Sequence, residues 1–452
     1  MTRPFTLALL TLGGLGACQS SERNTIDTAR AGAEAPEPAP AALKITGPDV
    51  GAGPRLPPPN ATPSGTKFSK VIGWSGDATP KAPDGFTVTL FADSLKYPRW
   101  LHVLPNGDVL VAESRTEAPE RIPAAVRKQL EVSGIFGPSA NRISRLRDKD
   151  KDGRAETRET FLDGLKQPFG MLALGNTFYV ANTDALLSYP FDSAQGRITG
   201  NGRKILDLPA GGYNNHWTRN VIANRDGSKL YVTVGSGTNV DEEKVDRKDK
   251  RRAAVLELNP DGSDMRVFAS GLRNPNGLDW EPTSGALWTA VNERDELGDE
   301  LVPDYITSVR EGAFYGWPFA YWGPNEDPRL KGQAPELVSK AIAPDYATGA
   351  HTASLGLTFG DGLRFPDRYQ RGAFVGQHGS WNRSQLTGYR VAFVPFESGR
   401  PSGGMEEFLG GFIADSGKAE VWGRPVGLAV TPDGALLVAD DAGNRIWRVA
   451  AK

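Results

Sequence analysis

A strand–turn–strand unit recurs along most of this chain, and it limits the possible folds more than any other feature. Each copy has an apolar strand, a Gly-containing turn and a second strand that ends in small residues. Six copies occupy residues 97–114, 167–184, 217–236, 274–293, 354–381 and 424–441. The third copy reads WTRNVIANRDGSKLYVTVGS, where β-branched residues suit strands and Asp226-Gly227 suits a tight turn. A second hairpin lies between copies, so six units of four strands predict an all-β fold, a six-bladed β-propeller.

The two ends of the repeat region predict how such a ring would close. After the last copy only AGNRIWRVAAK remains, in which NRIWRVAAK supplies one strand and leaves the sixth unit without its fourth. Before the first copy, residues 85–95 (GFTVTLFADSL) form a strand pattern with no partner nearby. We expect this N-terminal strand to complete the C-terminal blade, because closure removes exposed sheet edges. An open array of sheets would leave both observations unexplained.

The N-terminal region predicts export. Residues 1–18 combine Arg3 with a short apolar stretch that cannot span a bilayer, as in a signal peptide. Leu15-Gly16-Ala17-Cys18 is similar to the signal box of bacterial lipoproteins. That similarity implies cleavage before Cys18, a lipid anchor there, and a periplasmic or outer-membrane-anchored protein. The alternative is an ordinary secretory signal in which the cysteine is incidental.

Composition separates the rest of the chain into two parts. Residues 19–66 are rich in Ala, Pro, Ser and Gly and predict a disordered tether, whereas residues 67–452 carry the propeller pattern. Cys18 is the only cysteine, which excludes an internal disulfide and a thiolate metal cluster. The net charge of −2 gives no basic field for nucleic acid. No Gly-x-Ser-x-Gly, P-loop or HExxH motif is present, so nucleophilic serine chemistry has little support.

The loops that precede the first strand of each unit converge on one axis in a propeller. Arginines and histidines collect at these positions: Arg99, Arg219, Arg273, Arg424, His216 and His351. Arginine pairs with carboxylates through two hydrogen bonds, so the set favours an anionic ligand. The alternative is that individual arginines pair with Asp and Glu of neighbouring blades. Histidine is the side chain best suited to take a proton near neutral pH, although a buried structural histidine is the plainer alternative for His216.

Four stretches resemble the soluble quinoprotein glucose/sorbosone dehydrogenases. They are the His216 turn followed by LYVTVGSGTN, GLRNPNGLDW at 271–280, REGAFYGWP at 310–318, and RPVGLAVTPDGALLVADD at 424–441. Members of that family are six-bladed propellers that bind pyrroloquinoline quinone (PQQ) and calcium. The resemblance covers about residues 84–449. It implies PQQ- and Ca²⁺-dependent oxidation of a sugar or related polyol or aldehyde, with hydride transfer to the quinone and an external electron acceptor.

The resemblance also implies roles for individual residues. His216 matches the general base that takes the hydroxyl proton, and Arg273 matches the arginine beside the reacting quinone oxygen. Asn274 matches a cofactor-contacting asparagine. Arg424 matches an arginine that binds a cofactor carboxylate.

Other positions depart from the family pattern or complete it. Asn292 and Glu293 fall where the family supplies backbone carbonyls to a calcium ion, although the family's Gly-Pro is missing there. A family lysine of the fifth blade is replaced by VGQHGSWNR, so we expect His378 or Arg383 to contact the cofactor instead. Arg219 completes the cationic set that we expect to bind it.

An acidic loop predicts a second ion site without any family resemblance. Asp148, Asp150, Asp152 and Gly153, followed by Glu159, fit the spacing of a calcium loop in which carboxylates surround one cation. The flanking residues read as strands, so we expect a structural calcium on a hairpin. The alternative is a solvated acidic turn neutralised by its two interleaved lysines.

Two other functions remain open. A propeller of this kind could bind a sugar or protein partner without redox chemistry, or act as a calcium-dependent lactonase-like hydrolase. The combination of His216 with Arg273-Asn274 favours the dehydrogenase.

Overall fold

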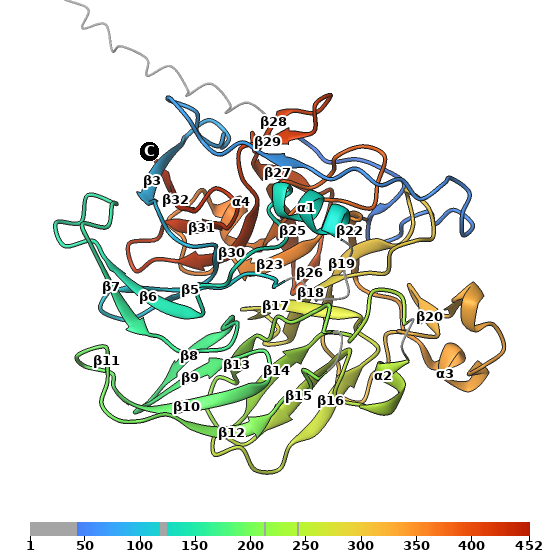
Figure 1. The fold of residues 1–452 in the computed structure, drawn as a ribbon, viewed down its shortest axis with the longest axis horizontal. Coiled ribbons are helices and arrows are strands. Elements are labelled where there is room, and N and C mark those ends of the chain that lie inside the picture. The colour runs from blue at the N-terminus through green and yellow to red at the C-terminus, as the bar shows by residue number, and fades with distance from the viewer. Residues whose placement is uncertain (1–42, 118–123, 212–213, 242–243) are drawn as a thin grey trace, which may run out of the picture. The chain divides into compact units, whose positions relative to one another are not determined.

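Six antiparallel sheets that share a four-stranded plan dominate the part of the chain that the structure describes (Figure 1). This computed structural model describes residues 43–452, apart from 118–123, 212–213 and 242–243. The predicted signal peptide, Cys18 and the predicted tether up to residue 42 lie outside the described residues.

The first three sheets follow the chain in order. Sheet 1 contains β4 (Pro98–Val103), β5 (Val109–Glu113), β6 (Arg142–Arg147) and β7 (Thr157–Leu162). Sheet 2 contains β8 (Met171–Leu174), β9 (Thr177–Ala181), β10 (Ala185–Asp192) and β12 (Arg203–Asp207), with the short β11 (Arg197–Ile198) paired to β10. Sheet 3 contains β13 (Val221–Ala223), β14 (Leu230–Val234), β15 (Ala254–Leu258) and β16 (Arg266–Ser270).

Two of the last three sheets, sheets 4 and 6, include a strand from the N-terminal region. Sheet 4 contains β17 (Asn274–Trp280), β18 (Leu287–Asn292), β19 (Pro303–Ser308) and β22 (Tyr346–Ala350), with β1 (Val50–Gly51) at its outer edge. Sheet 5 contains β23 (Ser354–Phe359), β24 (Gly372–Gln377), β25 (Arg390–Glu397) and β27 (Glu406–Leu409), with β26 (Arg400–Pro401) paired to β25. Sheet 6 contains β30 (Pro425–Val430), β31 (Leu436–Asp440), β32 (Arg445–Ala451) and β3 (Phe86–Ala92).

The remaining elements are short. A small sheet joins β2 (Lys70–Val71), β29 (Glu420–Val421) and β28 (Ile413–Asp415), and β20 (Ala320–Tyr321) pairs with β21 (Asn325–Glu326). The helices are α1 (Ala124–Val132), α2 (Val245–Lys248), α3 (Pro335–Lys340), α4 (Asp367–Gln370) and the 3-10 helix η1 (Pro328–Leu330). Among the described residues, no helix has both the length and the apolar character that a membrane span requires.

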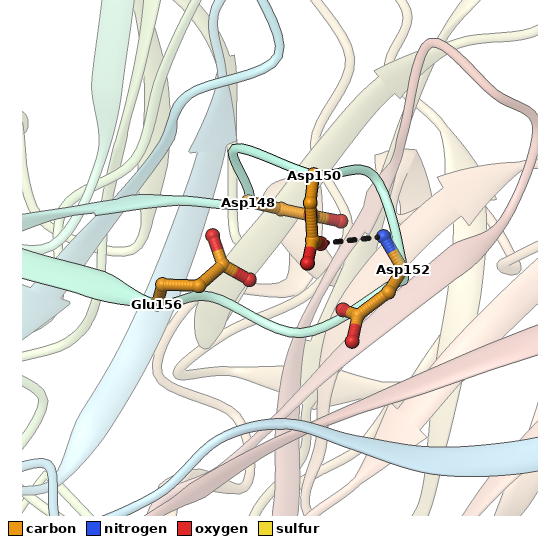
Figure 2. Close-up of side chains that lie close together, drawn as sticks. All are labelled: Asp148, Asp150, Asp152 and Glu156. Carbon is orange, nitrogen blue, oxygen red and sulfur yellow. Dashed lines mark hydrogen bonds between the residues drawn. The ribbon is translucent and has the colours of Figure 1, made fainter.

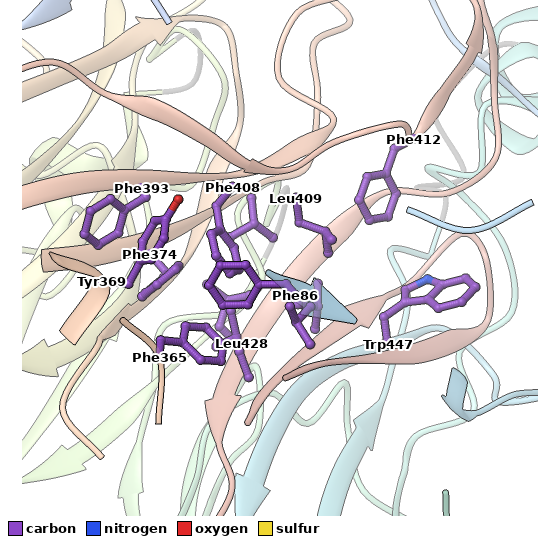
Figure 3. Packing of buried hydrophobic residues seen from close by; sticks show 14 of the residues in the cluster. Phe86, Phe365, Tyr369, Phe374, Phe393, Phe408, Leu409, Phe412, Leu428 and Trp447 are labelled. Carbon is purple, nitrogen blue, oxygen red and sulfur yellow. The ribbon is translucent and has the colours of Figure 1, made fainter. Parts of the chain in front are cut away.

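Strands that are apolar on both faces explain how the sheets stack. Side chains alternate across a strand, so in β5 Val109 and Val111 pack toward sheet 6 while Leu110 and Ala112 pack toward sheet 2. Each buried cluster therefore lies between two neighbouring sheets. In the cluster between sheets 5 and 6, Phe86 of β3 packs among aromatic side chains such as Phe374 (Figure 3).

The first strands of the six sheets contact one another in a cycle. The order is β4, β8, β13, β17, β23 and β30, which in turn contacts β4. β3 pairs antiparallel with β32, from Phe86 opposite Ala451 to Ala92 opposite Ile446, and the two lie together in Figure 1. This arrangement is consistent with a β-propeller, and it joins the predicted N-terminal strand to the last sheet.

Glycines on the first strands let neighbouring sheets approach closely. A Cβ on Gly277 would lie 2.5 Å from the backbone nitrogen of Leu357, and one on Gly427 would lie 2.6 Å from the carbonyl oxygen of Arg99. Gly170 and Gly356 meet the backbone of the next first strand in the same way. The backbones themselves therefore determine how closely these strands pack around the centre.

Residues 43–66 do not form the disordered tether that their composition predicted. We call residues 43–78 the N-terminal arm. Its β1 extends sheet 4, Asp49 accepts a hydrogen bond from the backbone nitrogen of Ala350 (2.8 Å), and Leu56 packs against the cluster between sheets 3 and 4. Composition underestimates order here because backbone hydrogen bonds and a buried aspartate, rather than many apolar side chains, hold the segment.

Candidate active site

A cavity of about 400 Å³ lies where the loops before β4, β13, β17, β23 and β30 converge. Many of the predicted site residues line it: His216, Arg273, Asn274, Asn292, Glu293, His378 and Arg424. Arg99 and His351, which the repeat pattern also placed at this position, line it too. The structure therefore brings together residues that are more than three hundred positions apart in the sequence, from Arg99 to Arg424, because equivalent ends of successive sheets meet there.

The contacts of His216 define which ring nitrogen carries the proton. Its Nδ1 lies 2.7 Å from Ser236 Oγ and 3.1 Å from the Ser236 carbonyl oxygen. The Ser236 hydroxyl donates its single hydrogen to the Thr238 carbonyl oxygen (2.9 Å), so toward His216 it can only accept. Both partners of Nδ1 are acceptors, and Nδ1 therefore carries the hydrogen. Nε2 is left as the basic nitrogen, 3.3 Å from the Asn215 side-chain nitrogen.

Burial keeps the His216 ring neutral. Loss of water lowers the pKa of His216 well below its usual value, and the nearby positive charge of Arg273 lowers it further. A neutral imidazole with a fixed Nδ1–H presents the form that a general base needs.

Arg273 and Asn274 lie beside this histidine. A Cβ on Gly235 would lie 2.6 Å from His216 Cβ and 2.4 Å from Asn274 Oδ1, so both side chains flank the same glycine. Asn274 Oδ1 is buried and has no hydrogen-bond partner among the described residues. An orphaned acceptor in a cavity wall is a position at which a ligand donor can bind.

The guanidinium of Arg273 is fixed by its surroundings. It donates to the Asn239 carbonyl (2.9 Å) and side-chain oxygen (2.5 Å), and to the carbonyl oxygens of Asn292 (3.2 Å) and Glu293 (2.5 Å). These last two carbonyls are the ones that the family resemblance assigned to calcium. Each carbonyl oxygen has two lone pairs, so Arg273 occupies only one acceptor site on each.

Buried carboxyl groups lie along the same wall. Burial raises the pKa of Glu293 to about 7, against the opposing charge of Arg273. Burial also raises the pKa of Asp304 to about 6, and this carboxylate accepts the backbone N–H of Glu293 at 2.8 Å. Asp295 lies 3.1 Å from His351 Nδ1, and the other His351 nitrogen lies 2.9 Å from the Gly298 carbonyl. The repeat pattern missed Asp295 and Asp304 because both come after the repeated hairpin β17–β18. Asp295 lies in the loop that follows it and Asp304 in the next strand, β19, and these segments differ between units.

Asp441, Arg99 and His378 form a second charged group in the cavity lining. Asp441 accepts from Arg99 Nη1 (2.5 Å) and lies 2.8 Å from His378 Nε2. Burial alone would raise the pKa of Asp441, but His378 and Arg99 together hold it far below its usual range. The charge of Arg99 is therefore largely compensated. Asp441 itself was not predicted, although its place at the end of the last repeat copy is a signal that could have found it.

Arg424 differs from Arg99 in its partners. Its guanidinium donates to the carbonyl oxygens of His378 (2.9 Å), Gly379 (3.0 Å) and Ser133 (3.3 Å). Among the described residues it has no carboxylate partner within salt-bridge distance, and only 2% of it is exposed. A buried cation held only by carbonyl dipoles can accept an anionic ligand.

Two predicted cofactor contacts lie outside the cavity lining. Arg219 is fully buried, and it donates to the carbonyl oxygens of His216 (2.7 Å), Thr218 (2.8 Å) and Pro209 (2.7 Å). Arg383 donates to the Ala350 carbonyl oxygen (3.1 Å) and approaches Asp49 of the arm. Arg219 therefore shapes the His216 turn from behind, and Arg383 anchors the arm, so neither guanidinium faces the cavity.

The acidic loop lies apart from the cavity, on the hairpin between β6 and β7. Asp148, Asp150, Asp152 and Glu156 point toward one another (Figure 2), with one carboxylate oxygen from each within 4.8 Å of the others. Glu159, which the loop spacing predicted as a ligand, instead pairs with Arg145 across the hairpin. The fourth carboxylate of this cluster is therefore Glu156 and not Glu159.

Comparison with known proteins gives a family match over most of the chain. The sequence profile of the TrAA12-like family matches residues 80–452. A protein of Borreliella burgdorferi is 28% identical over 386 residues, which are 82% of this chain and 91% of that protein. The aldose sugar dehydrogenase YliI of Escherichia coli is 27% identical over 205 residues, 40% of this chain and 52% of that enzyme. A pyrroloquinoline quinone-dependent pyranose dehydrogenase of Coprinopsis cinerea is 26% identical over 272 residues, 49% of this chain and 35% of that enzyme.

Solved structures share the fold at low sequence identity. The holo PQQ domain of the Coprinopsis cinerea pyranose dehydrogenase superposes with a TM-score of 0.66 at 19% identity, covering 85% of this chain and all of that domain. A calcium structure of the Trichoderma reesei enzyme of carbohydrate-active family AA12 gives a TM-score of 0.66 at 18% identity, covering 86% of this chain and all of that enzyme.

Proposed function

Because the chain belongs to the TrAA12-like family, we propose that it oxidises a sugar, or a related polyol or aldehyde, with PQQ as redox cofactor. The relatives with assigned activity are sugar dehydrogenases, which supports sugar oxidation in general. The observation that carries the proposal is the state of His216: a half-buried, neutral imidazole whose Nδ1 carries the hydrogen, lining the same cavity as Arg273 and Asn274.

The cavity wall suits a planar anionic cofactor. PQQ carries carboxylates and quinone oxygens, which require cations and hydrogen-bond donors. Arg424 provides a buried guanidinium without a carboxylate partner among the described residues, and the orphaned Nε of Arg99 provides a further donor. We propose that Arg424, Arg273 and Asn274 hold the cofactor, with His378 beside them. When bound, PQQ supplies the chemistry of accepting two electrons from the substrate carbon, which an external acceptor later removes.

His216 then has a defined task. Its Nε2 takes the proton of the substrate hydroxyl, while Ser236 holds the ring through Nδ1. Burial disfavours the charged imidazolium, so Nε2 must return the proton to solvent or another group before the next turnover. Arg273, fixed by five hydrogen bonds to oxygens of Asn239, Asn292 and Glu293, supplies a positive charge that does not need to reorganise.

Calcium enters the proposal at two positions. In the cavity, the carbonyl oxygens of Asn292 and Glu293, which accept from Arg273, lie beside buried carboxyl groups and would offer oxygen ligands to the ion. On the β6–β7 hairpin, Asp148, Asp150, Asp152 and Glu156 offer oxygen ligands of the kind that Ca²⁺ prefers. We assign the second position a structural role.

The proposal also includes the remaining features of the chain. Pairing of β3 with β32, together with the cyclic contacts of the first strands, supports a closed six-bladed propeller. The signal box at Cys18 supports export and a lipid anchor that holds the enzyme at a membrane.

A substitution of His216 tests the function directly. His216→Gln keeps a hydrogen-bonding side chain but removes the base, and we expect turnover to fall at least about a hundredfold while PQQ affinity stays within about threefold. The measurements are dye reduction with a panel of sugars and a PQQ titration by absorbance, both with Ca²⁺ present. His102→Gln is the matched control, because His102 is half-buried outside the cavity lining and accepts the Ala173 backbone N–H. Near-native turnover in His216→Gln would show that His216 is not the base.

The pH dependence gives a second test. Because burial lowers the pKa of His216 well below 6.5, the neutral base persists as pH falls through 6.5. We therefore expect no loss of kcat/KM from His216 protonation between pH 8 and about 6.5. An acidic limb centred at 6.5 or above that disappears in His216→Gln would contradict the buried, neutral state.

A further inference from the structure

Two aromatic rings at the cavity come from different parts of the chain. Phe68 belongs to the N-terminal arm, and Trp381 follows β24 of sheet 5. Both side chains line the cavity, and both are half-buried. Their rings are stacked, with centroids 5.7 Å apart and planes inclined by 5°. The pair therefore contributes apolar aromatic surface to a cavity whose other walls carry many charged groups.

The backbone around Phe68 is fixed independently of its side chain. The Lys67 backbone nitrogen donates to the Trp381 carbonyl oxygen (2.8 Å), and the Asn382 side chain donates to the Gly65 carbonyl oxygen (3.0 Å). A Cβ on Gly65 would lie 2.4 Å from the Ser384 backbone nitrogen, so the arm touches the loop after β24 directly. Phe68 is thus held at one position without relying on burial of its ring.

A second stacked pair that involves the arm offers a comparison. Trp74 of the arm stacks on Trp422 with centroids 5.9 Å apart, and neither residue lines the cavity. Trp74 is 7% exposed and also contacts Phe412 and Trp447. That pair anchors the arm through burial, whereas the Phe68–Trp381 pair keeps its surface open to the cavity. Anchoring of the arm alone does not explain two large apolar rings at that position.

We infer that Phe68 and Trp381 bind the apolar C–H face of a sugar ring, and that Phe68 is a specificity-determining residue contributed by the N-terminal arm. Sugars present hydroxyl groups at their edges and C–H groups on their faces, so an aromatic surface beside charged groups matches both. This inference rests on the proposed function for its substrate class, an aldose or a reducing disaccharide.

Kinetics of two variants and two controls test the assignment. Phe68→Ala and Trp381→Ala are each expected to raise KM about tenfold while kcat changes less than about twofold. This pattern is expected when a variant loses the same binding energy in the ground state and in the transition state. Trp422→Ala loosens the same arm without touching the cavity, and its KM should stay within about twofold of the parent. Phe68→Tyr keeps the ring face and should retain the parent KM.

A binding measurement separates this inference from the redox function. Glucose, galactose, xylose, maltose and cellobiose are titrated against the full chain without PQQ, with tryptophan fluorescence as the readout. We expect at least one of these sugars to change the fluorescence, and Trp381→Phe to lose most of that change. This result would support the sugar surface even if no sugar is oxidised.

Three results would overturn the assignment. The first is the absence of a fluorescence change with every sugar in the panel. The second is an equal rise in KM for Phe68→Ala and Trp422→Ala, which would make Phe68 a structural anchor. The third is a loss of PQQ affinity in Phe68→Ala and Trp381→Ala with sugar binding unchanged, which would assign the stacked rings to the cofactor.

Discussion

Removing one side chain from β3 tests whether this strand holds the sheets together. Phe86 is 8% exposed, and its ring meets those of Phe365, Phe408 and Tyr369 nearly edge-on at 4.8, 5.2 and 5.4 Å. A buried Phe→Ala change typically costs about 3–5 kcal/mol, and three aromatic pairs place Phe86 in the upper part of that range. We therefore expect Phe86→Ala to lower the free energy of unfolding by about 4 kcal/mol.

The location of the loss is more informative than its size. Among the described strands, β3 pairs only with β32, so its amides should open locally once Phe86 no longer packs. A local loss of about 3 kcal/mol corresponds to an increase of more than a hundredfold in hydrogen exchange for Phe86–Ala92. Exchange is measured by mass spectrometry, and overall stability by urea unfolding.

A matched variant separates local from global effects. Phe178 of β9 is fully buried and meets Phe161 at 5.2 Å and Phe191 at 5.5 Å, within sheets whose strands are contiguous in sequence. Phe178→Ala should cost a comparable free energy without accelerating exchange in β3. If Phe86→Ala loses less than about 1 kcal/mol, or leaves β3 exchange unchanged, the strand does not close the ring.

Three further predictions concern the ions, the cofactor and the membrane. Asp150→Asn should abolish most of the Ca²⁺-dependent rise in melting temperature, which corresponds to about 2.7 kcal/mol at a hundredfold excess over Kd, whereas Glu159→Gln should retain it; an equal response of both variants would place the ion elsewhere. Arg424→Gln should weaken PQQ binding by about 10- to 100-fold in an absorbance titration, because a charged hydrogen bond contributes about 1.5–3 kcal/mol, while Arg383→Gln should leave the affinity within about threefold; the reverse order would refute the cavity assignment. Cys18→Ser should move the protein from the membrane fraction to the soluble fraction on immunoblots, and unchanged fractionation would argue against a lipid anchor.

The repeat pattern predicted much of the architecture because each copy is a local hairpin. The copies at 97–114, 217–236 and 274–293, for example, correspond to β4–β5, β13–β14 and β17–β18. Alternating apolar residues and Gly-containing turns determine such hairpins without long-range information. Convergence of the loops before these strands then placed His216 near Arg273 and Asn274.

Predictions that required the direction of one side chain were less successful. The loop before β13 contains both His216 and Arg219, but the arginine points behind the turn toward backbone carbonyls. Loop position alone does not distinguish the two directions. At the acidic hairpin, the spacing to Glu159 comes from a calcium loop that a helix follows, although the flanking residues here were read as strands. β7 follows instead, and Glu159 then lies directly opposite Arg145.

The close contacts made by the first-strand glycines have a consequence for redesigning substrate range. Gly277 and Gly427 leave no room for a larger residue between neighbouring backbones. The atoms that a new side chain would meet first belong to the backbone, so a change of rotamer in a neighbour cannot relieve the clash. A library of variants on these strands would return mostly unfolded proteins and few altered specificities. Phe68 of the arm lines the same cavity from outside the repeats, and we expect changes of this side chain to leave the sheets in place because contacts of Lys67 and Gly65 hold the backbone there. Directed evolution of this scaffold toward new sugars should therefore diversify the arm and hold the first strands constant.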